Sequence, residues 1–191
     1  DIASLTGSKT VNCNIVNTPV GVFGGVDSKF TVSLKASVYT DVQLSAEIDN
    51  SLIAAYNEEN GTSYEALPSD FASFLKVNAA TIKPGELSGD VAVTMDSEKA
   101  KQLNGSYIIP MHIAMTYSDG TKKVFDEPVY TTIGVKETLI NDNPSEMIGS
   151  DGDHSDWTCL EAVNFNKDSF TTYRWKPLAK NISEASYVVD F

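Results

Sequence analysis

Apolar residues alternate with polar or small ones in three short runs near the start of the chain, at positions 11–15, 30–38 and 42–48. A period of two places one side of an extended segment in a core and leaves the other side in water. The pattern therefore predicts three antiparallel strands. Between the first two runs, the glycines and the proline of residues 17–29 favour a long connection or an irregular sheet edge over regular structure.

A helical segment is predicted after the third strand. Asp49, Asn50 and Ser51 provide a polar start, and Gly61 provides a stop. The intervening residues form one apolar face, made of Leu52, Ile53, Ala55 and Tyr56. We expect this helix to plug one end of a β-sandwich.

Turn signals continue through the middle of the chain. A Leu-Pro turn at 67–68 leads into a second short helical piece, and a Pro-Gly turn at 84–85 leads into an alternating strand over 91–95. Ser97 is predicted to cap a two-turn helix that an Asn-Gly pair closes at 104–105.

The clearest predicted hairpin follows this helix. Residues 106–117 alternate, Asp119 and Gly120 form a tight turn, and residues 122–135 return as the second strand. Pro110 and Pro128 each lack a donor for the strand ladder. At these two points we expect the strands to lie at an edge or to be bulged.

Six or seven short strands with turns between them, and two small helices in the connections, predict an all-β fold. The architecture expected is an immunoglobulin-like β-sandwich with short helical insertions, followed by the start of a second β domain. A parallel α/β fold is disfavoured because no strand is followed by a long crossover helix.

The residues around this helical insert also form a recognisable series. In chain order they are Tyr56-Asn57, Asn60-Gly61-Thr62, Tyr64, Leu67-Pro68, Ile82, Pro84-Gly85-Glu86, Tyr107 and Pro110. Over roughly residues 10 to 136, the series resembles a domain of unknown function in Bacteroidetes. In that family the domain is the N-terminal module of surface lipoproteins and glycan-processing enzymes of polysaccharide-utilisation systems. The resemblance implies a context of glycan uptake.

The composition changes near residue 137. Residues 1–136 are assigned to the sandwich, and residues 137–156, rich in Asn, Asp, Ser, Gly and Pro, are assigned to a linker. Residues 157–191 hold both tryptophans and are read as the beginning of a second, incomplete β domain. This last segment resembles the start of discoidin-type carbohydrate-binding modules, in which a Trp-containing loop precedes a strand similar to YVVDF.

Charge narrows the classes of partner. The formal net charge is -12, from 26 acidic and 14 basic residues, and it disfavours nucleic acid and anionic lipid surfaces. No run of 18 apolar residues and no signal peptide is present. The protein is then either cytoplasmic or has lost a targeting segment. The resemblance and the small polar start DIASLTGSKT favour the second alternative, a cell-surface outer-membrane lipoprotein attached only through a lipid anchor that was removed with its signal segment.

Two cysteines, Cys13 and Cys159, lie far apart in the sequence. Two independent buried thiols are favoured over a structural disulfide, which stays open as the alternative. Neither reading has the spacing of a metal site.

Catalytic chemistry is poorly represented. His112 lies on the polar side of its strand, where we expect a surface or cross-strand role, and no nucleophile motif accompanies it or His154. Paired carboxylates occur at Glu58-Glu59, Asp126-Glu127 and Asp151-Asp153, but sequence neighbours point apart rather than across a sugar. The chain is therefore predicted not to be an enzyme.

A metal site is considered at one loop only. Asp151, Asp153 and Ser155 place oxygen ligands at alternating positions, as a Ca2+ loop does. The loop lacks the glycine and glutamate of an EF-hand, so a solvated acidic linker is favoured over structural Ca2+.

Sugar binding needs an aromatic platform with polar groups beside it. Such residues are concentrated near the end of the chain, at Trp157, Tyr173, Arg174 and Trp175. Core packing is the alternative for at least two of these aromatic side chains. Tyr39, Tyr117 and Tyr130 are less concentrated candidates in the sandwich.

The sequence thus favours a non-catalytic module of a surface glycan-binding lipoprotein, a spacer or scaffold with oligosaccharide or polysaccharide as ligand and other surface glycan-uptake proteins as partners. One alternative is an accessory N-terminal domain of a glycoside hydrolase whose catalytic domain is absent here. Another is a structural adhesion or protein-interaction domain. The fold cannot choose among them, because immunoglobulin-like sandwiches host many functions.

Overall fold

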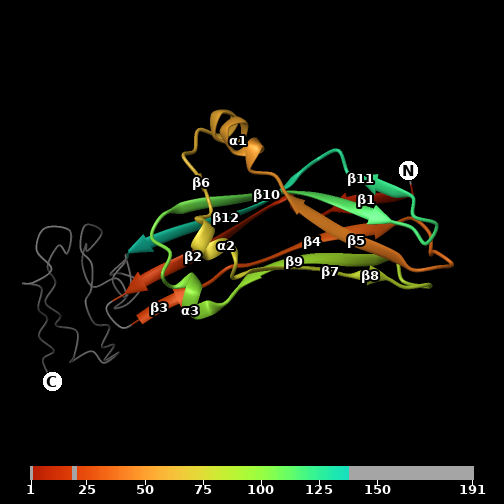
Figure 1. The fold of residues 1–191 in the computed structure, drawn as a ribbon, viewed down its shortest axis with the longest axis horizontal. Coiled ribbons are helices and arrows are strands. Elements are labelled where there is room, and N and C mark those ends of the chain that lie inside the picture. Colours follow the sequence, from red (N-terminus) through yellow and green to blue (C-terminus); the bar gives the residue numbers. More distant parts are fainter. Residues whose placement is uncertain (1, 19–20, 138–191) are drawn as a thin grey trace, which may run out of the picture. The chain divides into compact units, whose positions relative to one another are not determined.

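A computed structural model describes residues 2–18 and 21–137 of the chain (Figure 1). The chain divides into two compact units, one of Asp1–Ile15 and Gly24–Val135, the other of Val16–Phe23 and Lys136–Phe191. The predicted linker and second β domain, residues 137–156 and 157–191, lie outside the described residues except for Glu137. Those two domain assignments therefore stay predictions.

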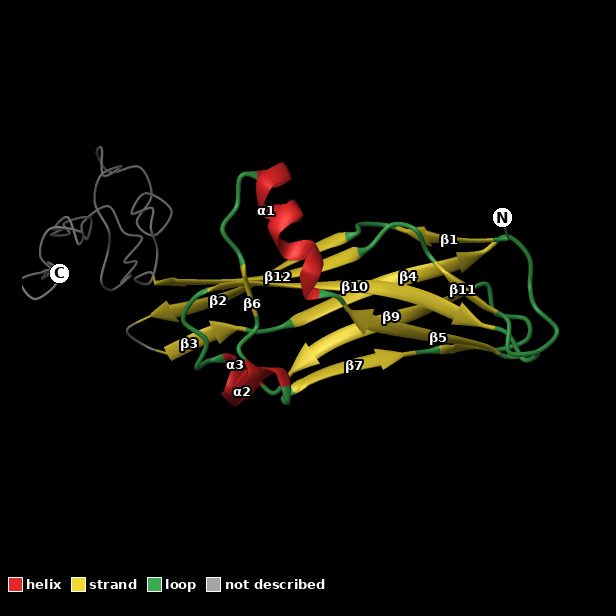
Figure 2. Cartoon of the chain, turned by 45° about the horizontal axis from the view of Figure 1, so that its top comes forward, coloured by secondary structure: helices red, strands yellow, loops and turns green. Residues whose placement is uncertain are grey.

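Two antiparallel sheets form the fold (Figures 1 and 2). The smaller sheet has the strand order β1 (Ala3–Thr6), β4 (Asp27–Leu34), β9 (Ser88–Met95) and β7 (Leu75–Ala79). The larger sheet has the order β3 (Gly21–Gly24), β2 (Thr10–Thr18), β12 (Val129–Glu137), β10 (Ser106–Thr116), β5 (Val42–Ile48) and β8 (Thr81–Ile82). Two short strands also pair with β10, namely β11 (Lys122–Val124) and, in parallel, β6 (Glu65–Ala66). The predicted immunoglobulin-like β-sandwich is confirmed.

The core lies between the two sheets and is made by alternate residues of their strands. It includes the completely buried side chains of Ile15, Val32, Val42, Val91, Val93, Met111, Ile113, Met115 and Ile133. One polar contact crosses it, because the Ser28 and Thr131 hydroxyls lie 2.7 Å apart and are both buried. Burial of this alternating set is the main source of stability for the sandwich.

Two details of the strand prediction are wrong. The run at 30–38 ends as a strand at Leu34, because its ladder with β1 finishes where Lys35 N donates to Ile2 O. The polar start of the chain holds strand β1, which the sequence pattern did not indicate. The glycine-rich segment 17–29 contains the short edge strand β3, whose Gly21 and Gly24 have positive φ angles, in agreement with the irregular sheet edge that was one of the two alternatives expected there.

The helical insert has the predicted ends. Asp49 accepts a hydrogen bond from Ser51 N at the start of the 3-10 turn η1 (Asn50–Leu52), and α1 (Ile53–Asn60) stops at Gly61 with φ of +64°. Its predicted role as a plug is wrong, because α1 has no buried residue and packs Tyr56 on Tyr130 of β12. Figure 2 shows α1 standing on the outer side of the larger sheet.

The two later helices are short. Pro68 precedes α2 (Ser69–Ala72), as the Leu-Pro turn predicted. The helix α3 (Ser97–Ala100) has one turn instead of two, and its cap is Asp96 rather than Ser97. Asp96 is the N-cap because its carboxylate accepts a hydrogen bond from Lys99 N at 3.0 Å.

Both prolines of the predicted hairpin break the regular pattern, in different ways. Pro110 lies in the central strand β10, not at a sheet edge, but its carbonyl accepts from Asp49 N just past the end of β5. The Pro110 nitrogen, which carries no hydrogen, therefore lies at the gap between β5 and β6. No strand pairs with β10 at that point, so no ladder hydrogen bond is lost. Pro128 lies between β11 and β12, so the predicted single strand over 122–135 is two strands.

Candidate functional site

The outer face of the larger sheet carries a group of polar side chains on neighbouring strands. Strand register places His112 opposite Glu47 and Ala114 opposite Ser45, with Pro110 opposite Tyr130. These side chains point away from the core, because the intervening residues Met111 and Ile113 are completely buried between the sheets. The outer face defined by these residues lies beside the base of α1 (Figure 2).

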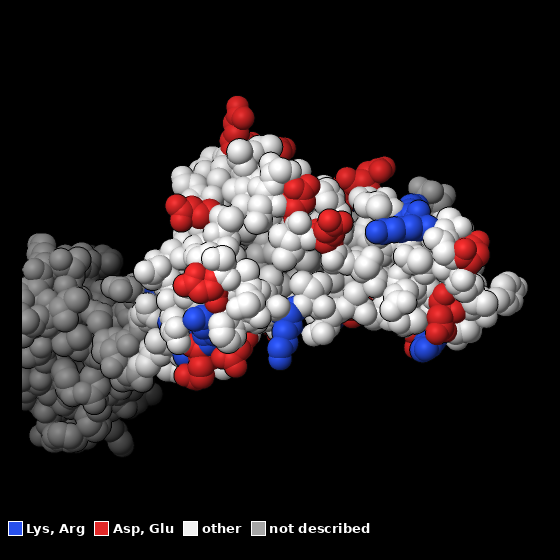
Figure 3. All heavy atoms as spheres, viewed as in Figure 1, with Lys and Arg blue, Asp and Glu red and all other residues white. Residues whose placement is uncertain are grey.

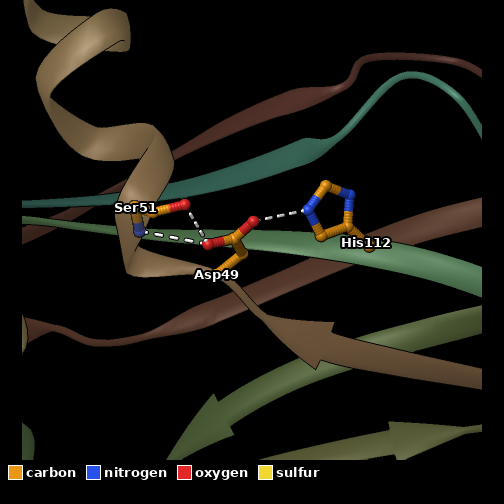
Figure 4. A network of polar contacts seen from close by, with 3 residues as sticks. All are labelled: Asp49, Ser51 and His112. Carbon is orange, nitrogen blue, oxygen red and sulfur yellow. Dashed lines mark hydrogen bonds and ion pairs between the residues drawn. The ribbon is translucent and has the colours of Figure 1, made fainter.

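Asp49 is the centre of a small network on this face (Figure 4). One carboxylate oxygen accepts from Ser51 N at 3.1 Å and from Ser51 Oγ at 2.5 Å. The other lies 2.8 Å from His112 Nε2. Hydrogen bonds from Ser51 and then from His112 hold the pKa of Asp49 below its ordinary value. Both imidazole and hydroxyl thus favour the ionised carboxylate.

This arrangement is suited to structure rather than to nucleophilic catalysis. In a catalytic triad the base contacts the nucleophile and a separate acid orients the base. Here Ser51 and His112 contact the same carboxylate from opposite sides, with no hydrogen bond between them (Figure 4). Asp49 therefore caps η1 and attaches the start of the helical insert to β10.

An aromatic cluster lies on the same face. The rings of Tyr56 and Tyr130 are 4.5 Å apart, and those of Tyr56 and Tyr64 are 6.1 Å apart. Desolvation, with smaller contributions from Glu59 and Tyr56, raises the pKa of Tyr130. The three rings hold the insert against the sheet.

The signature residues after Tyr56 are used to close the insert. Asn57 donates from Nδ2 to Tyr64 O at 2.9 Å, and its Oδ1 accepts from Thr62 Oγ1 at 2.8 Å and Tyr64 N at 2.9 Å. Gly61 permits the left-handed turn between them. The motif that suggested the family is therefore a structural device of the insert.

A trough of about 300 Å³ lies farther along the outer face. Its lining includes Ser45, Glu47, His112, Lys122 and Val124. Alternation in β5 shows that Ser45 and Glu47 are solvent-facing. Only the register shows that they adjoin His112 and the hairpin strand β11, so sequence reasoning did not identify this trough.

A second depression of about 320 Å³ lies between β1 and the segment after β11. Lys9 and Glu127 form an ion pair at its border, which occupies one member of the predicted Asp126-Glu127 carboxylate pair. Glu58 and Glu59 are exposed on α1 and line neither of these two depressions. Acidic side chains are scattered over the face seen in Figure 3.

The described residues also bear on metal binding, membrane-spanning helices, Cys13 and His112. No three His, Cys, Asp or Glu side chains there are grouped to hold a metal ion. No helix of residues 2–18 and 21–137 has the length and apolarity needed to cross a membrane. Cys13 is a buried free thiol, and burial raises its pKa. His112 has the cross-strand position expected for it.

The residues predicted to bind ligand or metal lie outside the described part of the chain. They are Trp157, Tyr173, Arg174, Trp175, Asp151, Asp153 and Ser155, and Cys159 and His154 also lie outside it. Of the sandwich tyrosines, Tyr39 is 97% exposed and Tyr130 belongs to the aromatic cluster.

Comparison with known proteins agrees with the fold. A protein-family model with the description "-like, N-terminal domain" matches residues 5–120. No curated protein matches the chain. A two-domain protein of unknown function from Bacteroides fragilis has 16% identity and a TM-score of 0.53, over 74% of this chain and 47% of its own.

A Bacteroides ovatus structure described as a "putative carbohydrate binding protein" has 20% identity and a TM-score of 0.50. The match covers 70% of this chain and 37% of that protein. This chain thus spans less than half of the length of either of these two structures. A third structure, the Bacteroides thetaiotamicron endoglycosidase EndoBT-3987 with its Man5GlcNAc product, has 19% identity and a TM-score of 0.42, over 64% and 28% of the two chains.

Proposed function

The chain belongs to this family of N-terminal domains, and from that membership we propose that it is a non-catalytic module of a cell-surface glycan-binding lipoprotein. The observation that carries the proposal is the family match over residues 5–120, on a sandwich whose interior is filled by packed side chains. The fold likeness to a Bacteroides ovatus protein described as carbohydrate-binding is compatible with this role.

The chemistry of the described residues supports a non-catalytic role. The most polar cluster, formed by Asp49, Ser51 and His112, satisfies its own hydrogen bonds in capping η1. The family signature residues Asn57, Gly61 and Thr62 are engaged in closing the insert. These side chains stabilise a rigid body, which is the property that a spacer or scaffold requires.

In this proposal the sandwich holds a ligand-binding segment away from the outer membrane, to which a lipid anchor attaches the protein. Trp157, Tyr173, Arg174 and Trp175 provide stacking and hydrogen bonds to an oligosaccharide. Asp151, Asp153 and Ser155 provide oxygen ligands for a structural Ca2+ ion. Other glycan-uptake proteins of the same surface are the expected neighbours.

The test is a glycan-array screen followed by calorimetry on the whole chain, with Trp157→Ala and Trp175→Ala beside it. Phe74→Ala is the matched control, since it removes an aromatic side chain that is 43% exposed on the sandwich and is not a candidate for sugar binding. We expect binding to fall about tenfold or more in at least one tryptophan variant, the loss that removal of a stacking aromatic produces. Binding to no glycan would refute the proposal and favour the adhesion or hydrolase-accessory alternatives.

A further inference from the structure

The outer-face trough is formed by three rows of side chains across β5, β10 and β11. Gln43, Thr116 and Lys122 form one outer row, of which only Lys122 lines the trough, and Glu47 and His112 form the other. The middle row contains the smaller residues Ser45, Ala114 and Val124. A row of short side chains between two rows of longer ones leaves the depression of about 300 Å³.

One wall of this trough is held in a defined orientation. His112 Nε2 is 2.8 Å from Asp49, and Asp49 is fixed in turn by two hydrogen bonds from Ser51. Figure 4 shows the imidazole directed along the sheet surface, with its second nitrogen turned away from Asp49. The ring edge is therefore available to a ligand at no further cost in side-chain entropy.

The other polar side chains of the trough are not paired with each other. Glu47 lies opposite His112 and Lys122 lies opposite Thr116, on opposite sides of β10 and four residues apart along it. At the usual strand spacing and rise their Cα atoms are about 16 Å apart, too far for an ion pair. Among the described residues, the side chains of Ser45, Glu47 and Lys122 make no hydrogen bond or ion pair. One acceptor, one cationic donor and one hydroxyl thus face the same space.

We propose that this trough binds a single neutral hexopyranose unit of an oligosaccharide. The inference rests on the proposed glycan-binding function but adds a site on the sandwich itself. Sugar hydroxyls both donate and accept, and Glu47, Lys122 and Ser45 offer both kinds of partner. Val124, which is 49% exposed, offers an apolar surface to the C–H groups of the ring.

Size and charge restrict the ligand class. A volume near 300 Å³ is at the small end of ligand sites, which suits one ring rather than a chain of several. The carboxylate of Glu47 balances the ammonium of Lys122, so the trough has no excess charge to select a uronic or sulfated sugar.

The test uses the whole chain, labelled for NMR, with the methyl glycosides of glucose, galactose, mannose and N-acetylglucosamine as probes. We expect one or more of them to shift the amides of residues 45–47 and 112–116 in a saturable way. Glu47→Ala and Lys122→Ala should each weaken that binding about tenfold, the factor for a lost hydrogen bond to a charged group. Glu58→Ala and Lys76→Ala, exposed residues away from the trough, are the matched controls.

The outcomes separate this site from the one at the C-terminal aromatics. Shifts that survive Trp157→Ala with Trp175→Ala and fail in Glu47→Ala support the trough. Binding that is lost in the tryptophan variants and unchanged in Glu47→Ala and Lys122→Ala would overturn the trough while leaving the proposed function intact. Preference for methyl glucuronide over the four neutral probes would also overturn it.

Discussion

Gly24 and Gly25 are adjacent in the chain but differ in what a side chain would meet. A Cβ atom added to Gly24 would lie 2.1 Å from the carbonyl oxygen of Asn14, whereas one added to Gly25 meets nothing within 4 Å. Gly24 also has a φ of +85°, and Gly25 does not have a positive φ. Replacing each by alanine therefore tests the close approach of two backbone segments with an internal control.

The magnitude follows from two costs, the backbone angle of Gly24 and the displacement of the Asn14 carbonyl. A positive φ costs an alanine about 1–2 kcal/mol. An ordinary carbon–oxygen contact is about 3.3 Å, so the Asn14 carbonyl must move by about 1 Å. That movement weakens the bond that Gly25 N donates to Asn14 O at 3.2 Å, worth about 1 kcal/mol. Gly24→Ala should thus destabilise by about 2–3 kcal/mol, and Gly25→Ala should be neutral or slightly stabilising.

Urea unfolding followed by far-ultraviolet circular dichroism measures both variants. With a dependence on urea of about 1–3 kcal/mol per molar, the midpoint of Gly24→Ala should fall by about 1–2 M. The midpoint of Gly25→Ala should stay at or above that of the unsubstituted protein. Equal stabilities of the two variants, within about 0.5 kcal/mol, would refute the close approach at Asn14.

Three further predictions concern polar groups. Thr131→Val should cost about 1–3 kcal/mol in urea unfolding because it leaves the buried Ser28 hydroxyl unpaired, and adding Ser28→Ala should recover most of the loss; additive effects would contradict the pairing. The pKa of Asp49 is lowered in the folded state, so the stability it adds is present above the pKa of the unfolded carboxyl and is lost as pH falls through the pKa of the folded state. Asp49→Asn should therefore flatten the decline in the urea unfolding midpoint below about pH 4. Identical acid profiles of the variant and the unsubstituted protein would contradict this. In a Cys159→Ser variant, Cys13 should react with a thiol reagent at least about tenfold more slowly in the folded protein than in urea, because its thiol is buried with a raised pKa; equal rates would show that it is accessible.

Much of the fold could be predicted from the sequence because its signals are local. Alternation identified the core sides of β2, β4 and β5, and Gly61 and Asp49 marked both ends of the helical insert. The errors arose where distant contacts decide the outcome. Strand β1 is a strand because β4 pairs with it, and Pro110 is tolerated in a central strand because β5 ends beside it.

The candidate site was less predictable for the same reason. Asp49 and His112 are 63 positions apart, and Ser45 and Val124 are neighbours only through Ala114 of the strand between them. Alternation shows that these residues face solvent, but only the register shows which of them share a row. The Asp119-Gly120 turn indicates the register between β10 and β11, but no local signal in the sequence carries the register between β5 and β10.

The hydrogen bonds of Asn57 show that the residues of the family signature and the residues that line the trough are different sets. The side chain that fits the signature is fully committed to Thr62 and Tyr64, inside the insert, and contributes nothing to the trough along β10. A sequence can therefore keep the signature while the residues at positions 45, 47 and 122 change, and the fold can be inherited without its ligand. Relatives should accordingly be grouped by those three positions, rather than by the motif, when their specificities are compared.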